Sequence, residues 1–136
     1  MPLYVVLHHR TAAGLTLPRG VSTHFDWMFD HGQALWTWST ESLAQPSLHT
    51  TMRATRLPDH RRDYLSYEGP LTGDRGDVQR VESGDFEILC AGPDHYEFAV
   101  SGSRCGVVAF QRTRSVLNGN CDDWYWSFRP VRADAS

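Results

Sequence analysis

Alternation of apolar and polar residues, rather than helical periodicity, is the dominant pattern of this chain. Side chains of a β-strand point to opposite faces with a period of two, and short segments of this kind recur between clusters of Gly, Pro, Asn and Asp. The predicted strands are residues 4–8, 23–29, 34–39, 52–56, 78–82, 86–90, 96–101, 105–111 and 124–128. This spacing is typical of a mainly β protein, either an antiparallel sandwich or a barrel.

Helical structure should be limited to short turns. No segment has a long, capped helical period, and we expect a turn of helix only at 43–48 or 61–65. Residues 67–76 are rich in turn-forming residues and predict a loop. A chain of 136 residues has room for one hydrophobic core. We therefore expect a single domain over residues 1–130, followed by a small, polar, flexible tail at 131–136.

Composition narrows the class of protein. The formal net charge of -3 and the pI near 6.1 argue against a protein that coats nucleic acid by bulk electrostatics, although they allow a local phosphate site. The sequence contains no long apolar run and no signal peptide, which predicts a cytoplasmic protein without membrane contact. The three cysteines form no C-x-x-C pair, so neither a disulfide framework nor a thiolate zinc site is indicated.

A divalent-metal site is the main chemical prediction. In the second predicted strand, His24 and Asp26 share one face, and three aromatic residues share the other face, which should enter the core. An imidazole and a carboxylate two residues apart form a rigid pair of ligands, but such pairs also occur by chance. His8 and His9 end the first strand and His60 lies in an arginine-rich segment, so these histidines are the candidates that could complete the site.

The segment around His60 carries side chains that bind phosphate. Arginine, histidine and tyrosine beside a metal can hold a phosphoryl oxygen and neutralise the charge that develops on it. The alternative is a solvated loop whose arginines pair with Asp59 and Asp63. The phosphate-binding candidates in this part of the chain are Arg53, Arg56, Arg61, Arg62 and Tyr64.

Four segments stand in a distinctive order along the chain. They are Tyr-Val-Val-Leu-His-His at 4–9, His-Phe-Asp-Trp-Met-Phe-Asp at 24–30, Leu-Trp-Thr-Trp at 35–38, and Asp-His-Arg-Arg-Asp-Tyr-Leu-Ser-Tyr-Glu-Gly at 59–69. A glycine-rich turn at 73–76 and an aromatic strand at 124–128 follow them. In these segments the chain resembles the 3′-phosphoesterase domain of bacterial DNA ligase D, over nearly its whole length.

The resemblance implies a small antiparallel β-barrel with short helical turns and a manganese-dependent hydrolase site that trims 3′ ends of DNA or RNA during repair. Whether the protein acts alone or beside a separate ligase or polymerase stays open. By the family's pattern, His9, His24 and Asp26 would bind Mn²⁺ or another divalent transition metal. The residues that match the family's groups around the scissile phosphate are His60 and Tyr64 and, more loosely, Arg53.

Three departures from the family's pattern bear on activity. Met28 stands where the family has an arginine, on the same strand face as His24 and Asp26, so a phosphate-clamping group is missing. Asp30 replaces a glutamate, and the longer segment 10–23 makes the choice of His9 over His8 depend on strand alignment. Loss of one charge-stabilising donor costs about 10² to 10³ in rate, so the sequence predicts weakened activity.

Two other functions stay open on the sequence alone. Met28 and the acidic net charge favour a module that keeps the barrel and recognises nucleic-acid ends or a protein partner without turnover. His24, Asp26 and His60 also have the form of the two-histidine, one-carboxylate triad of non-haem iron oxygenases. Oxygenases of the oxoglutarate type usually add a downstream arginine, and Pro70 stands at the corresponding distance in this chain.

Overall fold

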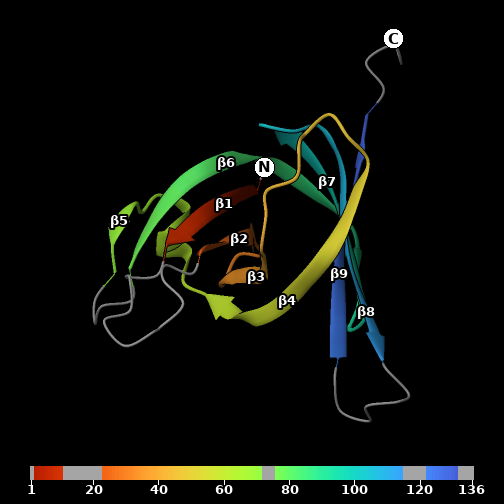
Figure 1. Ribbon diagram of the computed structural model, residues 1–136, viewed down its shortest axis with the longest axis horizontal. Helices are drawn as coiled ribbons and strands as arrows, with labels where there is room; N and C mark the ends of the chain where they lie inside the picture. Colours follow the sequence, from red (N-terminus) through yellow and green to blue (C-terminus); the bar gives the residue numbers. More distant parts are fainter. Residues whose placement is uncertain (1, 11–22, 72–75, 115–121, 132–136) are drawn as a thin grey trace.

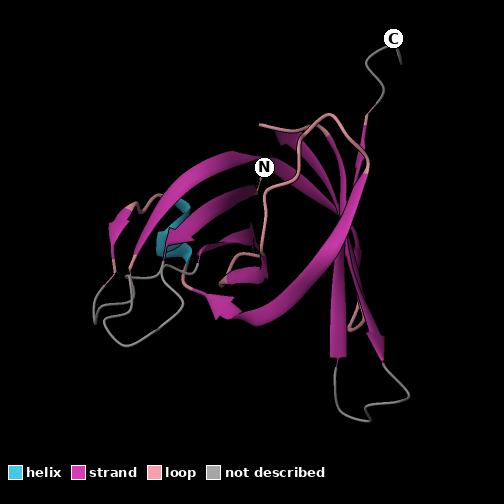
Figure 2. Cartoon of the chain, viewed as in Figure 1, coloured by secondary structure: helices cyan, strands magenta, loops and turns pink. Residues whose placement is uncertain are grey.

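Nine β-strands and one short helical segment make up the part of the chain that the computed structural model describes, residues 2–10, 23–71, 76–114 and 122–131 (Figures 1 and 2). All the strands belong to one sheet, and each pairs antiparallel with its neighbours. The strands are β1 (Leu3–Arg10), β2 (Thr23–Asp30), β3 (Leu35–Thr40), β4 (Thr50–His60), β5 (Gly69–Pro70), β6 (Asp77–Ala91), β7 (His95–Gly102), β8 (Gly106–Arg114) and β9 (Asp122–Pro130); the helical segment is η1 (Arg62–Leu65).

The sheet closes on itself. β1 pairs with β2 along one edge and with β6 along the other, so the strands form a ring in the order β1-β2-β3-β4-β9-β8-β7-β6, with β5 outside the ring on β6. Figure 1 shows the long β6 arching over β1 to complete this ring. The predicted fold class, mainly β with an antiparallel, barrel-like sheet and a short helical turn, is confirmed.

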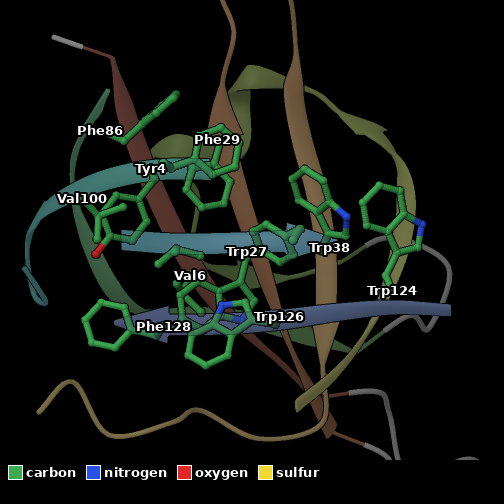
Figure 3. Packing of buried hydrophobic residues seen from close by; sticks show 13 residues of the cluster. Tyr4, Val6, Trp27, Phe29, Trp38, Phe86, Val100, Trp124, Trp126 and Phe128 are labelled. Atoms are coloured by element: carbon green, nitrogen blue, oxygen red, sulfur yellow. The ribbon is translucent and has the colours of Figure 1, made fainter. Parts of the chain in front are cut away.

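An aromatic core fills the ring. Phe29 stacks on Phe98 with ring centroids 4.0 Å apart, and Trp38 stacks on Phe110 at the same distance. Trp27 packs beside Trp126 (Figure 3). The aromatic face of β2 therefore enters the core, as its alternation predicts. Rings in offset or edge-to-face contact add about 0.5–1.5 kcal/mol per pair beyond the area that they bury.

The opposite face of β2 is also covered. Met28 is 1% exposed and packs with Val5, Leu7, Leu35 and Val78 in a second, smaller cluster of buried residues. Side chains from η1 lie against this cluster, and Figure 2 places the helical segment beside β1. Position 28 therefore belongs to a packed apolar layer.

A buried ion pair lies inside the ring. Arg104 donates from Nε and Nη2 to the two carboxylate oxygens of Glu82, over 2.7 and 2.9 Å, and Tyr4 donates to the same carboxylate over 2.9 Å. Arg104 Nη2 also donates to the carbonyl oxygen of Ala44 over 2.7 Å, which ties the segment between β3 and β4 to the sheet. Burial, followed by the negative charge of Glu82, raises the pKa of Tyr4 far above its ordinary value, so its hydroxyl remains a donor.

Two predicted strand boundaries are wrong for identifiable reasons. The sequence predicts a turn between strands at 78–82 and 86–90, but β6 runs unbroken through Gly84. A Cβ at this position would clash with the Ser101 carbonyl oxygen, so the glycine permits a close approach of β6 and β7. β4 also continues past residue 56 to His60. The register of β3 and β4 shifts where Pro58 lies, and a β-bulge at such a shift can include a proline, which has no N–H to donate.

The remaining structural predictions concern a loop, the helices and the tail. The predicted loop at 67–76 contains the two-residue strand β5, which pairs with β6. A helical segment is present at Arg62–Leu65, as expected for 61–65, whereas residues 43–48 are not helical. In the predicted tail 131–136, all but Val131 lie outside the described residues. Among the residues that the structure describes, no helix combines the length and apolar character needed to cross a bilayer.

Candidate metal centre

Three predicted ligands meet at one end of the β1–β2 pair. His9 lies directly opposite His24 in the antiparallel register, and Leu7 lies opposite Asp26. Residues that face each other across two strands project to the same side of the sheet. His9, His24 and Asp26 therefore share one face, and their potential ligand atoms all lie within 4.8 Å of one another.

The separations suit a single metal ion. His9 Nδ1 lies 3.0 Å from His24 Nε2 and 3.7 Å from Asp26 Oδ2, and His24 Nε2 lies 3.3 Å from Asp26 Oδ1. An ion about 2.1 Å from each donor holds neighbouring donor atoms about 3.0 Å apart at octahedral angles and about 3.4 Å apart at tetrahedral angles. Two imidazole nitrogens and one carboxylate oxygen can therefore bind an ion with little rearrangement.

Asp26 carries an incompletely satisfied charge. The residue is 4% exposed, and its Oδ1 atom has no hydrogen-bond partner among the described residues. A buried carboxylate is costly unless it is paired or binds a metal. Interaction with Asp26 raises the pKa of His24 above its ordinary value of 6.5, although burial opposes the shift. The negative charge at Asp26 thus attracts a cation, whether a proton on His24 or a metal.

The structure distinguishes the two adjacent histidines of β1. His8 faces away from the cluster and stacks on the ring of Phe25, with centroids 4.6 Å apart. Of the two, His9 is the one that points toward His24 and Asp26. The alignment that favours His9 over His8 therefore agrees with the strand register.

His60 and Tyr64 lie farther along the same face. His60 pairs with Leu35, which pairs with Asp30, so it stands two strands away from β2 and about 13 Å farther along the strand direction than Asp26. The His60 ring contacts Tyr64, and Tyr64 packs against the apolar cluster that contains Met28. The triad of His24, Asp26 and His60 expected for an iron oxygenase is not brought together; His9 is the histidine that lies beside the pair.

His60 has a defined tautomer when neutral. Its Nδ1 lies 2.8 Å from the carbonyl oxygen of Pro58, and a carbonyl can only accept. Nδ1 must therefore carry the proton, which leaves Nε2 as the acceptor in the neutral ring. An incoming ligand would meet Nε2.

Arg53 lies on another side of the metal ligands. It is 75% exposed on its side chain, contacts Asp123 over 3.3 Å, and lines a groove of about 860 Å³ that His24 also borders. The same groove is lined by Arg56 and Arg112. Of the three residues that the resemblance assigns to the phosphate, Arg53 borders the groove that His24 also lines, whereas His60 and Tyr64 lie on the other side of Met28.

One ion pair does not follow from the sequence pattern. Arg62 donates to both carboxylate oxygens of Asp30, over 3.0 and 2.9 Å, rather than pairing with Asp63. Burial alone raises the pKa of Asp30, but the hydrogen bonds from Arg62 and from the Gly32 N–H outweigh it, and the net pKa lies below the ordinary 3.8. The ion pair between Arg62 and Asp30 depends on the antiparallel register of the strands, which brings η1 beside the end of β2. It therefore could not be predicted from local sequence.

Substitution of Arg62 by glutamine should weaken the protein most at neutral pH. In the wild type the Asp30 carboxylate stabilises the fold above pH 3.8, and this contribution is lost as the pH falls through the lowered pKa of the folded state. Without Arg62, the effect of burial on the pKa of Asp30 dominates, and the ionised carboxylate no longer stabilises the folded state. Thermal unfolding measured from pH 3 to pH 7 should therefore show a lower melting temperature for Arg62→Gln than for the wild type at neutral pH. This difference should become smaller toward low pH. Arg61→Gln, at an exposed neighbour, is the control; a difference that is constant with pH contradicts this account.

Comparison of the sequence with known protein families gives no match, and a search of curated proteins gives none either.

Proposed function

We propose that this protein is a metal-dependent phosphoesterase that acts on 3′ ends of DNA or RNA. The convergence of His9, His24 and Asp26 is the observation that supports it most directly, since these side chains supply a donor set for one divalent transition metal. The order of segments shared with the 3′-phosphoesterase domain of DNA ligase D supplies the substrate class. The barrel-like fold agrees with that resemblance.

A bound Mn²⁺ or similar ion would polarise a phosphoryl oxygen and lower the pKa of a coordinated water. The protein's own groups act around it. Asp26 provides the negative charge that holds a cation, and Arg53 is exposed enough to reach a phosphate oxygen from the groove. His60, with its proton fixed on Nδ1 when neutral, would use Nε2 as the acceptor for a substrate group.

Metal removal is the direct test. Phosphate release from a primer-template with a 3′-phosphate should require a transition metal, so EDTA should abolish it and Mn²⁺ should restore it. Magnesium should restore less, because a site with two imidazoles suits transition metals better than Mg²⁺, which prefers oxygen ligands and retains its waters. Wild-type protein that releases no phosphate with Mn²⁺, Fe²⁺, Co²⁺ or Zn²⁺ contradicts the proposed activity.

A binding module is the second candidate, and the packing of Met28 favours it. The residue fills the apolar layer between the metal ligands and Tyr64, so no phosphate clamp projects from this part of β2. Such a module would bind 3′ ends, alone or beside a separate ligase or polymerase, without hydrolysis. If the protein binds the primer-template but releases no phosphate with any of the metals tested, the binding module is the supported function.

A further inference from the structure

The groove beside His24 forms where β4 changes partner. Residues 50–54 of β4 pair with β9, and residues 55–60 pair with β3. β3 ends at Thr40, so the sheet splits between β3 and β9 at this position. The groove lies along this split and takes its lining from the ends of β3 and β9 and from the part of β4 that spans them.

Arg56 is held in the groove by aromatic rings. Its guanidinium carbon lies 4.3 Å from the ring centre of Trp38, 5.0 Å from that of Tyr96 and 5.8 Å from that of Trp124. Stacking on aromatic faces is attractive for a guanidinium and restricts its orientation, so fewer rotamers are lost when it binds a ligand. The cation is therefore fixed in place before any anion arrives.

The ionic partner of Arg56 is weakly engaged. Asp59 Oδ1 lies 3.7 Å from Arg56 Nη2, beyond hydrogen-bond distance, whereas Asp59 Oδ2 is bonded to His31 over 2.9 Å. Within the described ranges, no hydrogen bond from the Arg56 guanidinium to a protein acceptor is present. A guanidinium has five N–H donors, and a phosphate can accept two of them side by side.

The other two arginines of the groove are more strongly paired. Arg112 donates from Nε to Asp94 over 2.7 Å, and Arg53 contacts Asp123 over 3.3 Å. Polar side chains near Arg56 add hydroxyl groups to the lining, namely those of Ser39 and Thr55. The groove thus offers one oriented cation with available donors, among groups that can hydrogen-bond an oxyanion.

The groove is also continuous with the metal centre. His24 borders both, and Asp26, Ser39 and Thr55 are consecutive partners across β2, β3 and β4. Neighbouring strands lie about 4.8 Å apart, so the backbone of Thr55 stands about 10 Å from that of Asp26. A few nucleotides of one nucleic-acid strand span this distance. Arg56 pairs with Trp38, which pairs with Trp27, so its side chain projects to the core face and lines the groove from the other side of the sheet.

We propose that the groove binds a backbone phosphate of the nucleic-acid strand whose 3′ end lies at the metal centre, and that Arg56 is its main contact. This inference rests on the proposed function and names its substrate more closely. The protein then distinguishes a 3′ end on a polynucleotide from a 3′-phosphomononucleotide, because only the polynucleotide fills the groove.

Binding, rather than turnover, tests the proposal. Fluorescence anisotropy with a labelled primer-template carrying a 3′-phosphate is measured across a KCl series for the wild type and Arg56→Gln. We expect the substitution to weaken binding about tenfold, as for a lost hydrogen bond to a charged group. The slope of the logarithm of the binding constant against the logarithm of the KCl concentration should decrease in magnitude by about 1, which corresponds to the loss of one phosphate contact. Affinity for a 3′-phosphomononucleotide should be unchanged.

The controls separate this role from a structural one. Arg129→Gln removes an exposed arginine at the far end of β9 and should leave the salt slope unchanged. Arg56→Lys keeps the charge and should retain the slope while losing part of the affinity, even if Arg56→Gln lowers the melting temperature. Equal affinity and equal slope for the wild type, Arg56→Gln and Arg56→Lys overturn the proposal.

Binding and phosphate release measured on the same wild-type protein with Mn²⁺ keep the two proposals distinguishable, and Asp26→Asn should lose release while it keeps the Arg56-dependent binding. Wild-type protein that binds through Arg56 but releases no phosphate supports the groove and contradicts the hydrolase. A protein that hydrolyses the primer-template and the mononucleotide equally well, with no effect of Arg56→Gln, supports the hydrolase and contradicts the groove.

Discussion

Asp26→Asn is expected to abolish both metal binding and metal-dependent phosphate release while leaving the metal-free protein folded. The wild-type carboxylate is buried and has an oxygen without a hydrogen-bond partner among the described residues, so its removal relieves a cost in the metal-free state. Loss of groups that merely orient ligands costs about 10- to 100-fold in metal affinity, and loss of a ligand itself should exceed that.

Thermal unfolding with and without Mn²⁺ measures this effect independently of turnover. At a free Mn²⁺ concentration about 100 times the dissociation constant, binding stabilises the wild type by about 2.7 kcal/mol. Asp26→Asn should gain almost nothing under the same conditions. His8→Ala is the matched control, since His8 neighbours His9 in sequence but faces Phe25. Equal stabilisation of the wild type and Asp26→Asn by Mn²⁺ would show that Asp26 is not a metal ligand.

Glu82→Gln should lower the stability of the fold severely. Glu82 and Arg104 are 5% and 2% exposed, and the substitution leaves the Arg104 guanidinium buried without its counter-charge. Removal of one partner of a buried ion pair costs about 3–5 kcal/mol. Stability of a domain is about 5–15 kcal/mol, so urea unfolding should show a large fall in the midpoint.

Two further variants isolate the ion pair. Tyr4→Phe removes one hydrogen bond to the same carboxylate and should cost about 1 kcal/mol. The double variant Glu82→Gln, Arg104→Met should be more stable than the sum of its single changes predicts, because it removes both charges. Additive losses in the double variant would show that packing, rather than charge pairing, explains the effect.

Alternation along the chain is enough to predict most of the strands. The aromatic face of β2 follows from a local pattern, and it enters the core. The boundaries that fail depend on neighbours distant in sequence. From the sequence alone, Gly84 predicts a turn, but its close approach to β7 explains the glycine within a strand. Pro58 likewise predicts a strand end, but the register shift between β3 and β4 accommodates it.

The convergence of the three candidate ligands depends on one strand pair, which makes it predictable from local sequence. His24 and Asp26 are fixed by a single strand, and the β1–β2 register then selects His9. The contacts of Arg56 could not be predicted, because its three rings come from three other strands. Phosphoesterase activity, manganese dependence and the roles of His60, Tyr64 and Arg53 stay predictions, since the packing of Met28 bears on them without deciding them.

The closure of the ring has a consequence for the order of assembly during synthesis. All three candidate ligands lie on one strand pair, so their convergence requires only that β1 pairs with β2. The other edge of β1 stays unpaired until β6 has left the ribosome, because β1 and β6 are far apart along the chain. A chain that stops before β6 would therefore expose the unpaired edge of β1, which makes such fragments prone to aggregation and to capture by chaperones.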